Sequence, residues 1–544
     1  MTATSAQTRT PAHAAPSARH AAPRLHNPTW TLILVCTAVF MLLLDVTIVS
    51  VALGNIQTEF GASLSSLQWV IDAYTLPLAG LLLTAATIGD RLGRKRVFTV
   101  GLAVFTLGSL ACALSGSAVA LDVTRAFQGI GAAMLFGTVM PLIGAAYPDP
   151  RRRAGAIGAF GATLAAATAV GPLVGGVLVE GPGWRWIFLI NVPIGVIALV
   201  ATIRLVGESR STAPRRADWY GTATLSLALL TLVFGLIRGA ADGWSTAYVI
   251  GLFVAAAALL AGFIVIENVV RDPMLDLSLF KRRSFVGVGL AAFAVAATVV
   301  ASTSYLALYM LNTLGYSPFQ GGLRFLPLTV ASFVAAPIAA RYATRLPMIV
   351  PIGGGLALVA IGLAFTARLT ADSSWTVLIP GFIVAGIGMG VSSAVVSSAA
   401  LNSVEANRAG MATGTVNTLR QVGVAVGVAA LGAIFTNRTV AAATSDLAGS
   451  ATPSQIGKLA DAIASGAGTK VTSAVPEPMR AALGQVARSA TASGLNSVLF
   501  VGALAGAVTT IITVVLIGSD QNRAAVHGGA TEEPAVAPKP EPAL

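Results

Sequence analysis

Four charged side chains interrupt long apolar stretches of this sequence: Asp45, Asp72, Arg125 and Arg324. Asp45 stands in MLLLDVTIVSVAL, residues 41–53, where every other residue is apolar except one threonine and one serine. A charge at the centre of a membrane-spanning helix costs on the order of 3 kcal/mol. Such a side chain is tolerated when it pairs with an opposite charge, faces water or, for a carboxyl group, takes up a proton. The chemistry open to these residues is therefore ion pairing and reversible protonation inside a membrane.

The elements that carry these charges are expected to be transmembrane helices. The chain has 544 residues, of which 55% are hydrophobic and 10% are charged, a composition outside that of soluble globular domains. About 20 apolar residues, rising about 1.5 Å each, cross the roughly 30 Å of hydrocarbon in a bilayer. Fourteen segments have this length: 29–53, 66–88, 97–116, 119–146, 154–180, 184–205, 218–238, 246–267, 284–311, 318–340, 346–367, 376–398, 408–436 and 494–517. The sequence therefore predicts an all-α polytopic membrane protein with fourteen transmembrane helices.

The positions of lysine and arginine predict the orientation of these helices. The short basic segments DRLGRKR at 90–96, DPRRR at 149–153 and FKRRS at 280–284 all fall on one side of the membrane. Because short basic loops stay in the cytoplasm, both termini are expected there. Topology and lipid headgroups then explain the formal charge of +12, and a nucleic acid partner is not expected.

This orientation places the four charges at one depth. At about 1.5 Å per residue, Asp45, Asp72 and Arg125 lie roughly 9 to 12 Å below the outer surface, and Arg324 reaches a similar level. We expect four charges at one level to serve a function. The alternative is that the two aspartates are only structural partners of the two arginines.

Two pairs of similar segments indicate an internal repeat. RAGAIGAFG at 153–161 resembles RAGMATGTV at 408–416, and RAFQGIGAAM at 125–134 resembles FIVAGIGMGV at 382–391. The pairs match the fifth helix with the thirteenth and the fourth with the twelfth, so the two central helices lie outside the repeat. Parallel repeats with a substrate site between them are the architecture of the major facilitator class of transporters.

The expected organisation is six helices, two inserted helices and six more. It comprises a tail at 1–28, a six-helix bundle at 29–205, two inserted helices at 218–267, a second six-helix bundle at 284–517 and a tail at 518–544. Composition predicts disorder for both cytoplasmic tails. The second bundle is expected to contain an external loop at 437–493, with a short helix that Thr452 caps and Pro453 begins.

A charged turn joins the second and third helices at GDRLGRKRV, residues 89–97. Asp90 can accept hydrogen bonds from Arg91 or Arg94, and Gly93 permits a tight turn. Such a turn would hold the inner helix ends in one state of the protein and release them in another. These residues are candidate gating residues.

The motif GPLVGG in the fifth helix places Gly171 and Gly175 four residues apart, with Pro172 between them. Small residues at this spacing let helices approach closely, and proline bends a helix. The motif predicts a hinge or a seal, while an ordinary packing face is the alternative.

Together these segments resemble the fourteen-helix drug:proton antiporters of the major facilitator superfamily, the QacA and EmrB kind. The resemblance covers residues 29–517 and is carried by LDVTIVSVAL, QWVIDAYTL, LDVTRAFQGIGAA, GPLVGG and WRWIFLINVPIG. It implies the major facilitator fold in a bacterial inner membrane. It also implies efflux of amphipathic drugs or antibiotics, which confers resistance and is driven by external protons.

The resemblance implies roles for the charged residues. Asp45 would be the main proton carrier, Asp72 a second carrier or the counter-ion of a cationic substrate, and Arg125 the group that sets how readily both take up a proton. The other candidate substrate-binding residues are Gln128, Arg324 and Arg420. We expect a monomer that works as a transporter without enzymatic activity, and no cofactor besides the proton gradient.

Three other functions compete with this one. The chain could be a dedicated exporter of one endogenous metabolite, such as a self-made antibiotic, an amino acid or a lipid. It could be a membrane-embedded enzyme or receptor. Against an enzyme, the four histidines lie in the tails, and both cysteines, Cys36 and Cys112, lie in predicted helices. No metal site is therefore expected. It could also import its substrate with protons, against which stands the resemblance to antiporters.

Overall fold

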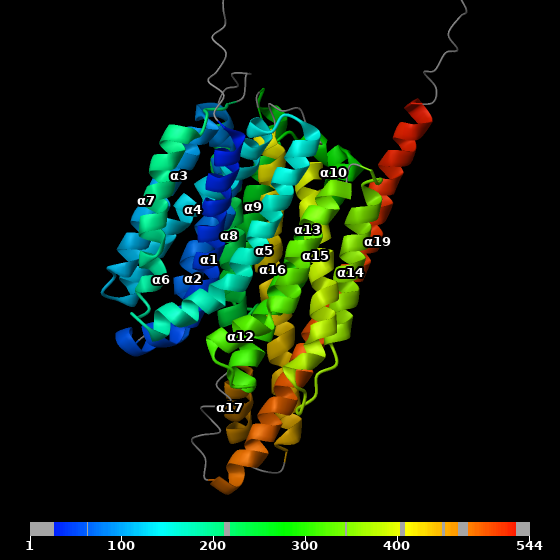
Figure 1. Cartoon of the computed structure of the whole chain (residues 1–544). Helices are drawn as coiled ribbons and strands as arrows, with labels where there is room; N and C mark the ends of the chain where they lie inside the picture. The colour runs from blue at the N-terminus through cyan, green and yellow to red at the C-terminus, as the bar shows by residue number, and fades with distance from the viewer. Residues whose placement is uncertain are drawn as a thin grey trace, which may run out of the picture.

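The computed structural model describes residues 27–61, 64–210, 218–271, 273–342, 345–402, 409–448, 452–465 and 477–528. Within these ranges the chain forms helices joined by short turns, without a β-strand. The helices run side by side as one bundle (Figure 1). The expected N-terminal tail lies outside the described residues up to residue 26, as do residues 529–544 of the expected C-terminal tail.

The first part of the chain supplies seven helices. They are α1 (Pro28–Phe60), α2 (Leu64–Leu92), α3 (Arg94–Ala113), α4 (Ala118–Ala146), α5 (Pro150–Glu180), α6 (Trp186–Leu189) and α7 (Asn191–Leu205). Several starts follow directly from polar residues in the sequence. Ser117 accepts a hydrogen bond from the Ala120 N–H and Asp149 from the Arg152 N–H, so both satisfy amides that a helix start leaves free.

The central and C-terminal parts follow the same plan. The elements are α8 (Trp219–Asp242), α9 (Ala247–Val269), η1 (Leu277–Lys281), α10 (Arg283–Val295), η2 (Ala296–Val300), α11 (Ala301–Leu308), η3 (Tyr309–Thr313), α12 (Pro318–Arg324), α13 (Leu326–Tyr342), α14 (Ile349–Thr366), η4 (Trp375–Leu378), α15 (Ile379–Asn402), α16 (Ala409–Asp446), α17 (Pro453–Ala464) and α19 (Glu477–Gly528). The elements η2 and η3 are π-helical turns within one nearly continuous helix that begins with α10. Such turns insert a residue into a helix and locally widen it.

Every one of the fourteen predicted segments contains a helix or a run of consecutive helices. Among the described residues, twelve of these are long and apolar enough to cross a membrane. The other two predicted segments contain α5 and the broken pair α12 and α13. The all-α fold and the multi-pass membrane class are therefore confirmed.

The internal repeat is visible in how the helices pack. In the first part, α1 packs against α5, while α4 packs against both α2 and α3. In the last part, α10 packs against α16, while α15 packs against both α13 and α14. The same order of helices thus makes the same pairs in both parts.

Glycines at corresponding positions of the repeat allow these pairs to form. A Cβ added to Gly131 on α4 would lie 2.5 Å from the Phe105 amide nitrogen of α3. A Cβ added to Gly388 on α15 would lie 2.5 Å from the Gly355 carbonyl oxygen of α14. Only glycine lets two helix backbones approach this closely.

The two parts meet mainly through α5, which packs against α12 and α13, and through α2, which packs against α16. The two central helices α8 and α9 pack against each other, and α8 also packs against α2 and α16. The Thr84 and Ser226 hydroxyls, 2.7 Å apart, join α2 to α8. One central helix therefore contacts one helix from each part.

The segment 437–493, which we expected to be an external loop, is largely helical. α16 continues to Asp446, α17 follows, and α19 begins at Glu477, so the three extend beyond one end of the bundle (Figure 1). Ala443, Ala460 and Ala490 are buried between them, which gives this extension an apolar core of its own. The expected helix start is confirmed, with Thr452 at the N-cap and Pro453 in the first turn.

The expected C-terminal tail also begins as a helix. α19 continues to Gly528, beyond the predicted end of the last apolar segment at residue 517. The hydropathy signal ends where a helix leaves the bilayer, whereas backbone hydrogen bonding can continue into water.

Candidate functional site

Asp45 and Arg125 form an ion pair between α1 and α4. The Arg125 Nη1 donates to Asp45 Oδ2. The Asp45 side chain is 0% exposed and the Arg125 side chain is 1% exposed. Two of the four charges that the sequence placed at one depth are therefore direct partners. A buried pair of this kind is retained only if further hydrogen bonds satisfy the remaining donors and acceptors.

Side chains from the neighbouring helices supply those hydrogen bonds. Asp45 Oδ1 accepts from Gln128 Nε2 at 2.9 Å and from Asn191 Nδ2 at 3.3 Å. Gln128 Nε2 also donates to Ser109 Oγ at 2.7 Å. The network therefore joins α1, α3, α4 and α7 around one carboxylate.

The arginine is held as firmly as the aspartate. Arg125 Nε donates to the Val70 carbonyl at 2.9 Å, and its Nη1 donates to Gln128 Oε1 at 2.8 Å. Its guanidinium carbon lies 4.3 Å from the centroid of the Tyr74 ring and 5.7 Å from the centroid of the Phe188 ring. A cation over aromatic faces is stabilised most where water is excluded, so these rings favour the charged arginine inside the bundle.

Asp72 lies on α2, outside this network. Its side chain is half-buried, and no hydrogen bond or ion pair joins it to a described residue. Its carboxylate interacts electrostatically with that of Asp122, and one oxygen of Asp122 is buried without a hydrogen-bond partner. The two candidate proton carriers thus differ: Asp45 lies in a closed ion pair, and Asp72 lies in a more open position.

Arg324 does not join the other three charges. It ends α12 in the C-terminal part, where its guanidinium stacks 3.4 Å from the centroid of the Tyr316 ring and 5.3 Å from that of Trp375. Its Nη1 donates to the Gln320 carbonyl at 2.7 Å, and its Nε is buried without a partner. Equal depth along the membrane normal does not fix position in the membrane plane, and no described hydrogen bond or ion pair joins Arg324 to the other three charges.

Arg420 lies on α16, the helix through which the C-terminal part contacts α2 and α8. Its side chain is half-buried, and in the described part of the chain it makes no hydrogen bond or ion pair. A cation in this position can attract a carboxylate, a phenolate or an electron-rich ring.

The repeat lacks a second copy of the ion pair. Phe382 and Ala385 occupy the positions on α15 that correspond to Arg125 and Gln128, and both are buried. Phe382 stacks on Phe325 with ring centroids 5.4 Å apart. The C-terminal counterpart of the site is therefore apolar.

The charged turn between α2 and α3 forms as expected. Arg94 Nε donates to Asp90 Oδ1 at 2.7 Å, both side chains are largely buried, and Arg91 lies beside them at the end of α2. Gly93 has a φ of +116°, a conformation that L side chains rarely adopt.

This turn is also fixed to the end of α7, which the sequence did not indicate. The Arg94 N–H donates to the Ser209 carbonyl at 2.8 Å, and the Lys95 N–H donates to Glu208 Oε1 at 3.0 Å. Four helix ends, those of α2, α3, α4 and α7, thus meet here, since Arg94 also donates to the Pro141 carbonyl at 3.4 Å.

The GPLVGG motif lies at the contact of α5 with α1 and α12. A Cβ added to Gly171 would lie 2.7 Å from Thr47 Cβ, and one added to Gly176 would lie 3.3 Å from Phe319 Cβ. Gly175 is buried, and α5 continues without a break through Pro172, whose side chain lies outside the described part of the structure. The motif therefore packs α5 against both parts of the molecule.

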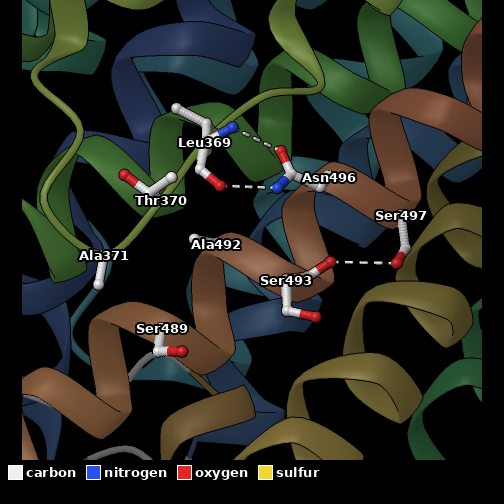
Figure 2. Close-up of a pocket in the computed structure, with 8 residues that line it drawn as sticks. All are labelled: Leu369, Thr370, Ala371, Ser489, Ala492, Ser493, Asn496 and Ser497. Carbon is white, nitrogen blue, oxygen red and sulfur yellow. Dashed lines mark hydrogen bonds between the residues drawn. The ribbon is translucent and has the colours of Figure 1, made fainter.

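A polar recess of about 410 Å³ lies away from these residues, between α19 and the turn that follows α14. Figure 2 shows Asn496 exchanging two hydrogen bonds with the Leu369 backbone, at 2.9 and 2.7 Å, while Ser489 and Ser493 line the same recess. Its lining carries no charged side chain. Among the described residues, no three His, Cys, Asp or Glu side chains gather as metal ligands would.

Sequence reasoning missed Ser109, Tyr74 and Asn191, which orient the ion pair. Serine, tyrosine and asparagine occur singly in many membrane helices, so their types gave no signal. Asn191 was the most detectable of the three, because it is an amide that follows the apolar run WIFLI.

Comparison with known proteins adds independent evidence on the family. The sequence profile of the Major Facilitator Superfamily matches residues 35–428. The chain is 36% identical over 416 residues to the multidrug resistance protein Stp of Mycobacterium tuberculosis, covering 75% of this chain and 76% of that protein. It is 34% identical over 413 residues to the tetracenomycin C resistance and export protein of Streptomyces glaucescens, covering 76% and 77% respectively.

A solved structure shares the fold at low sequence identity. The human organic anion transporter MFSD10 (TETRAN) superimposes with a TM-score of 0.58 and 13% identity, over 89% of this chain and 99% of that one. The helix arrangement, the packing repeat and the matched sequence profile agree, and the chain belongs to the Major Facilitator Superfamily.

Proposed function

We propose that this protein exports amphipathic drugs or antibiotics from the cytoplasm in exchange for external protons. The relatives at 34–36% identity carry names of resistance and export proteins, which supports efflux. The observation that carries the proton part of the proposal is the ion pair of Asp45 and Arg125. A protonatable carboxylate whose charged partner among the described residues is an arginine on another helix links protonation to helix packing.

The proposed coupling works through competition for the Asp45 carboxylate. When Asp45 is ionised, Arg125, Gln128 and Asn191 hold α1 against α4 and α7. A proton on Asp45 removes the attraction to Arg125, so α1 is freed to move. The closed network is one state of this cycle, and the proton enters in another state, in which α1 has separated from α4.

The membrane potential supplies enough energy for such an exchange. Each positive charge that moves inward through 100 mV yields about 2.3 kcal/mol, which supports a concentration ratio of some tens for the exported compound. No further cofactor is required by this proposal.

The substrate is proposed to contact the more open charges. Asp72 and Arg420 are half-buried and lack described partners, whereas both polar atoms of the Gln128 amide are engaged in the Asp45 network. We therefore assign Gln128 to the positioning of Asp45. Arg324, enclosed by Tyr316 and Trp375, is proposed to contact substrate only at the outer end of the C-terminal part.

The charged turn is proposed to act as the gate. Asp90 and Arg94 join α2, α3 and α4, and the Glu208 contact adds α7, so the turn can hold these ends together while the inner side is closed. The proposed setting is a bacterial cell membrane, with both termini in the cytoplasm and a monomeric protein.

A susceptibility panel in a bacterial host that lacks its own efflux pumps tests this function. Expression of the chain is expected to raise the inhibitory concentration of several unrelated amphipathic compounds, and a protonophore should abolish the effect. Asp372→Asn, a change at an exposed turn residue, serves as the matched control for Asp45→Asn. Resistance that survives the protonophore would contradict proton coupling.

Export of a single compound is the second candidate, because the Streptomyces glaucescens relative is named for one antibiotic. The same panel separates the two functions. Protection against one compound class alone would favour a dedicated exporter, whereas protection against unrelated classes would favour multidrug efflux.

A further inference from the structure

Two buried carboxyl groups meet where the central helices α8 and α9 approach the linker to the C-terminal part. Asp218, the N-cap of α8, is 4% exposed, and Glu267, in the last turn of α9, is 5% exposed. Acidic residues are almost never this buried without a cation or a proton. Neither residue belongs to the ion pair of Asp45 or to the charged turn.

Each carboxyl group has one oxygen that is bonded and one that is not. Asp218 Oδ1 accepts from the Gly221 N–H at 2.8 Å, and Glu267 Oε2 accepts from the Leu275 N–H at 3.3 Å. Asp218 Oδ2 and Glu267 Oε1 are buried and have no hydrogen-bond donor in the structure.

The two unbonded oxygens point at the same place. A Cβ added to Gly221 would lie 2.8 Å from Glu267 Oε1 and 2.8 Å from Asp218 Cγ, with Asp218 Oδ2 closer still. The Asp218 carboxyl group also interacts electrostatically with that of Glu267. Two ionised carboxylates would repel in this arrangement, and each would leave an acceptor without a donor.

No described cation neutralises this pair. The charged residues on the neighbouring elements are Asp90 and Arg91 at the end of α2, Asp276 and Lys281 around η1, and Arg282 and Arg283 where α10 begins. Among them and the rest of the described chain, the charge that acts on Glu267 is that of Asp218. Met274 of the linker, which accepts a hydrogen bond from Thr222 beside Asp218, carries no charge.

We propose that Asp218 and Glu267 hold one proton between them and thereby form a proton-binding site separate from Asp45. The proton turns one carboxyl into a donor, and the resulting O–H···O⁻ bond joins the two oxygens that otherwise lack a partner. Such charge-assisted bonds are short and about twice as strong as neutral ones.

This proton links the central helices to the C-terminal part. The Thr222 hydroxyl beside Asp218 donates to Met274 Sδ at 3.1 Å, and the Asp276 N–H donates to Met411 Sδ of α16 at 3.3 Å. The segment that Glu267 binds through Leu275 thus lies between α9 and α16. Loss of the proton would place two negative charges at this junction and loosen it.

Infrared spectroscopy of the purified full-length protein tests the proposal directly. The difference spectrum between wild type and Glu267→Gln at neutral pH should contain the C=O stretching band of a protonated carboxylic acid, and Asp218→Asn should shift or remove that band. Glu180→Gln, at an exposed residue on α5, should not affect it. A difference spectrum with carboxylate bands alone would overturn the proposal.

Thermal unfolding provides a second readout. The folded pair holds a proton that the unfolded chain releases at neutral pH, so the Tm of the wild type should fall as the pH rises from about 4, the ordinary pKa of a carboxyl group, until the folded pair also loses its proton. Glu267→Gln keeps a hydrogen-bond donor for Asp218 and should lose this part of the pH dependence. If Glu267→Gln does not accumulate in cells, Asp218→Asn provides the same test. Equal pH dependence in wild type and both variants would contradict a shared proton.

Addition of Mg²⁺ or Ca²⁺ tests whether a metal cation occupies the site instead. A gain in Tm seen in wild type but not in Glu267→Gln would show that a metal cation, not a proton, joins the pair, and would likewise overturn the proposal.

Discussion

Asp45 and Arg125 lie 80 residues apart in the sequence, yet their side chains form an ion pair inside the bundle that excludes solvent almost completely. The pair joins α1 to α4. The further hydrogen bonds of Asp45 and Arg125 come from Gln128 on α4, from Asn191 on α7 and from the Val70 carbonyl on α2. Removal of one partner from such a pair leaves a buried charge, which costs far more than removal of both.

A double-mutant cycle tests this energetic relationship. Arg125→Gln leaves Asp45 buried without a cation and should lower the free energy of unfolding by about 3–5 kcal/mol. Asp45→Asn combined with Arg125→Gln removes both charges and should recover much of that loss. Thermal unfolding in detergent measures both single variants and the double variant, and a loss in the double variant equal to the sum of the two single losses would show that the charges do not interact.

The packing repeat predicts that Gly131 and Gly388 respond alike to substitution. Alanine at either position places a Cβ 2.5 Å from the backbone of the next helix and should destabilise the protein by about 1–3 kcal/mol. Gly251→Ala on α9 is the matched control, because a Cβ there meets no atom within 4 Å and alanine favours the helix by about 1 kcal/mol. Loss of stability at one of the two repeat positions only would show that the two halves do not use glycine equivalently.

Gly93 should be essential to the charged turn. Alanine there must adopt a φ of +116° and would place its Cβ 2.7 Å from the Glu208 carboxyl. We expect Gly93→Ala to cost about 1–2 kcal/mol of stability and to reduce transport more than substrate binding. Gly243→Ala also has a positive φ, at +95°, but has no close neighbour beyond the Thr246 hydroxyl, so it controls for backbone strain alone. Equal transport by both variants would argue against a gating role for this turn.

The C-terminal end of α1 should contribute a pH-dependent part of the stability. Hydrogen bonds from Trp184 at 2.6 Å and Arg185 at 2.9 Å lower the pKa of the Glu59 carboxyl. Because the lowered pKa favours the ionised form in the folded state, this contribution is present above the unfolded pKa and is lost as the pH falls through the folded pKa.

Glu59→Gln therefore should lower the Tm at neutral pH and have little effect at about pH 3. The loss in the free energy of unfolding is expected to be below about 1 kcal/mol, because the Arg185 side chain is 37% exposed and the Glu59 side chain is 42% exposed. A difference in Tm between wild type and variant that does not change with pH would contradict this account.

The helices could be predicted from the sequence, because each is marked by an apolar run of the length that a membrane requires. The pairing of Asp45 with Arg125 could be anticipated in part, since both residues lie at one depth. Depth says nothing about position in the membrane plane, and Arg324, which lies at a similar predicted depth, stacks on Tyr316 in the other part of the molecule.

Polar elements were the hardest to predict. The ends of α16 and α19 continue beyond the bundle with alanines in their small core, and alanine-rich polar helices lack the hydropathy signal of a spanning segment. The pair of Asp218 and Glu267 was not anticipated either, since the two residues are far apart in sequence and each stands near a helix end, where a charge is usually solvated.

Proton release on substrate binding tests the central claim most directly. A compound identified in the susceptibility panel is added to purified protein in weakly buffered solution, and the pH change and the bound compound are measured together. Wild type and Asp372→Asn should release protons as the compound binds, whereas Asp45→Asn should bind it without proton release. Proton release by Asp45→Asn equal to that of the wild type would contradict the role of Asp45 as the proton carrier.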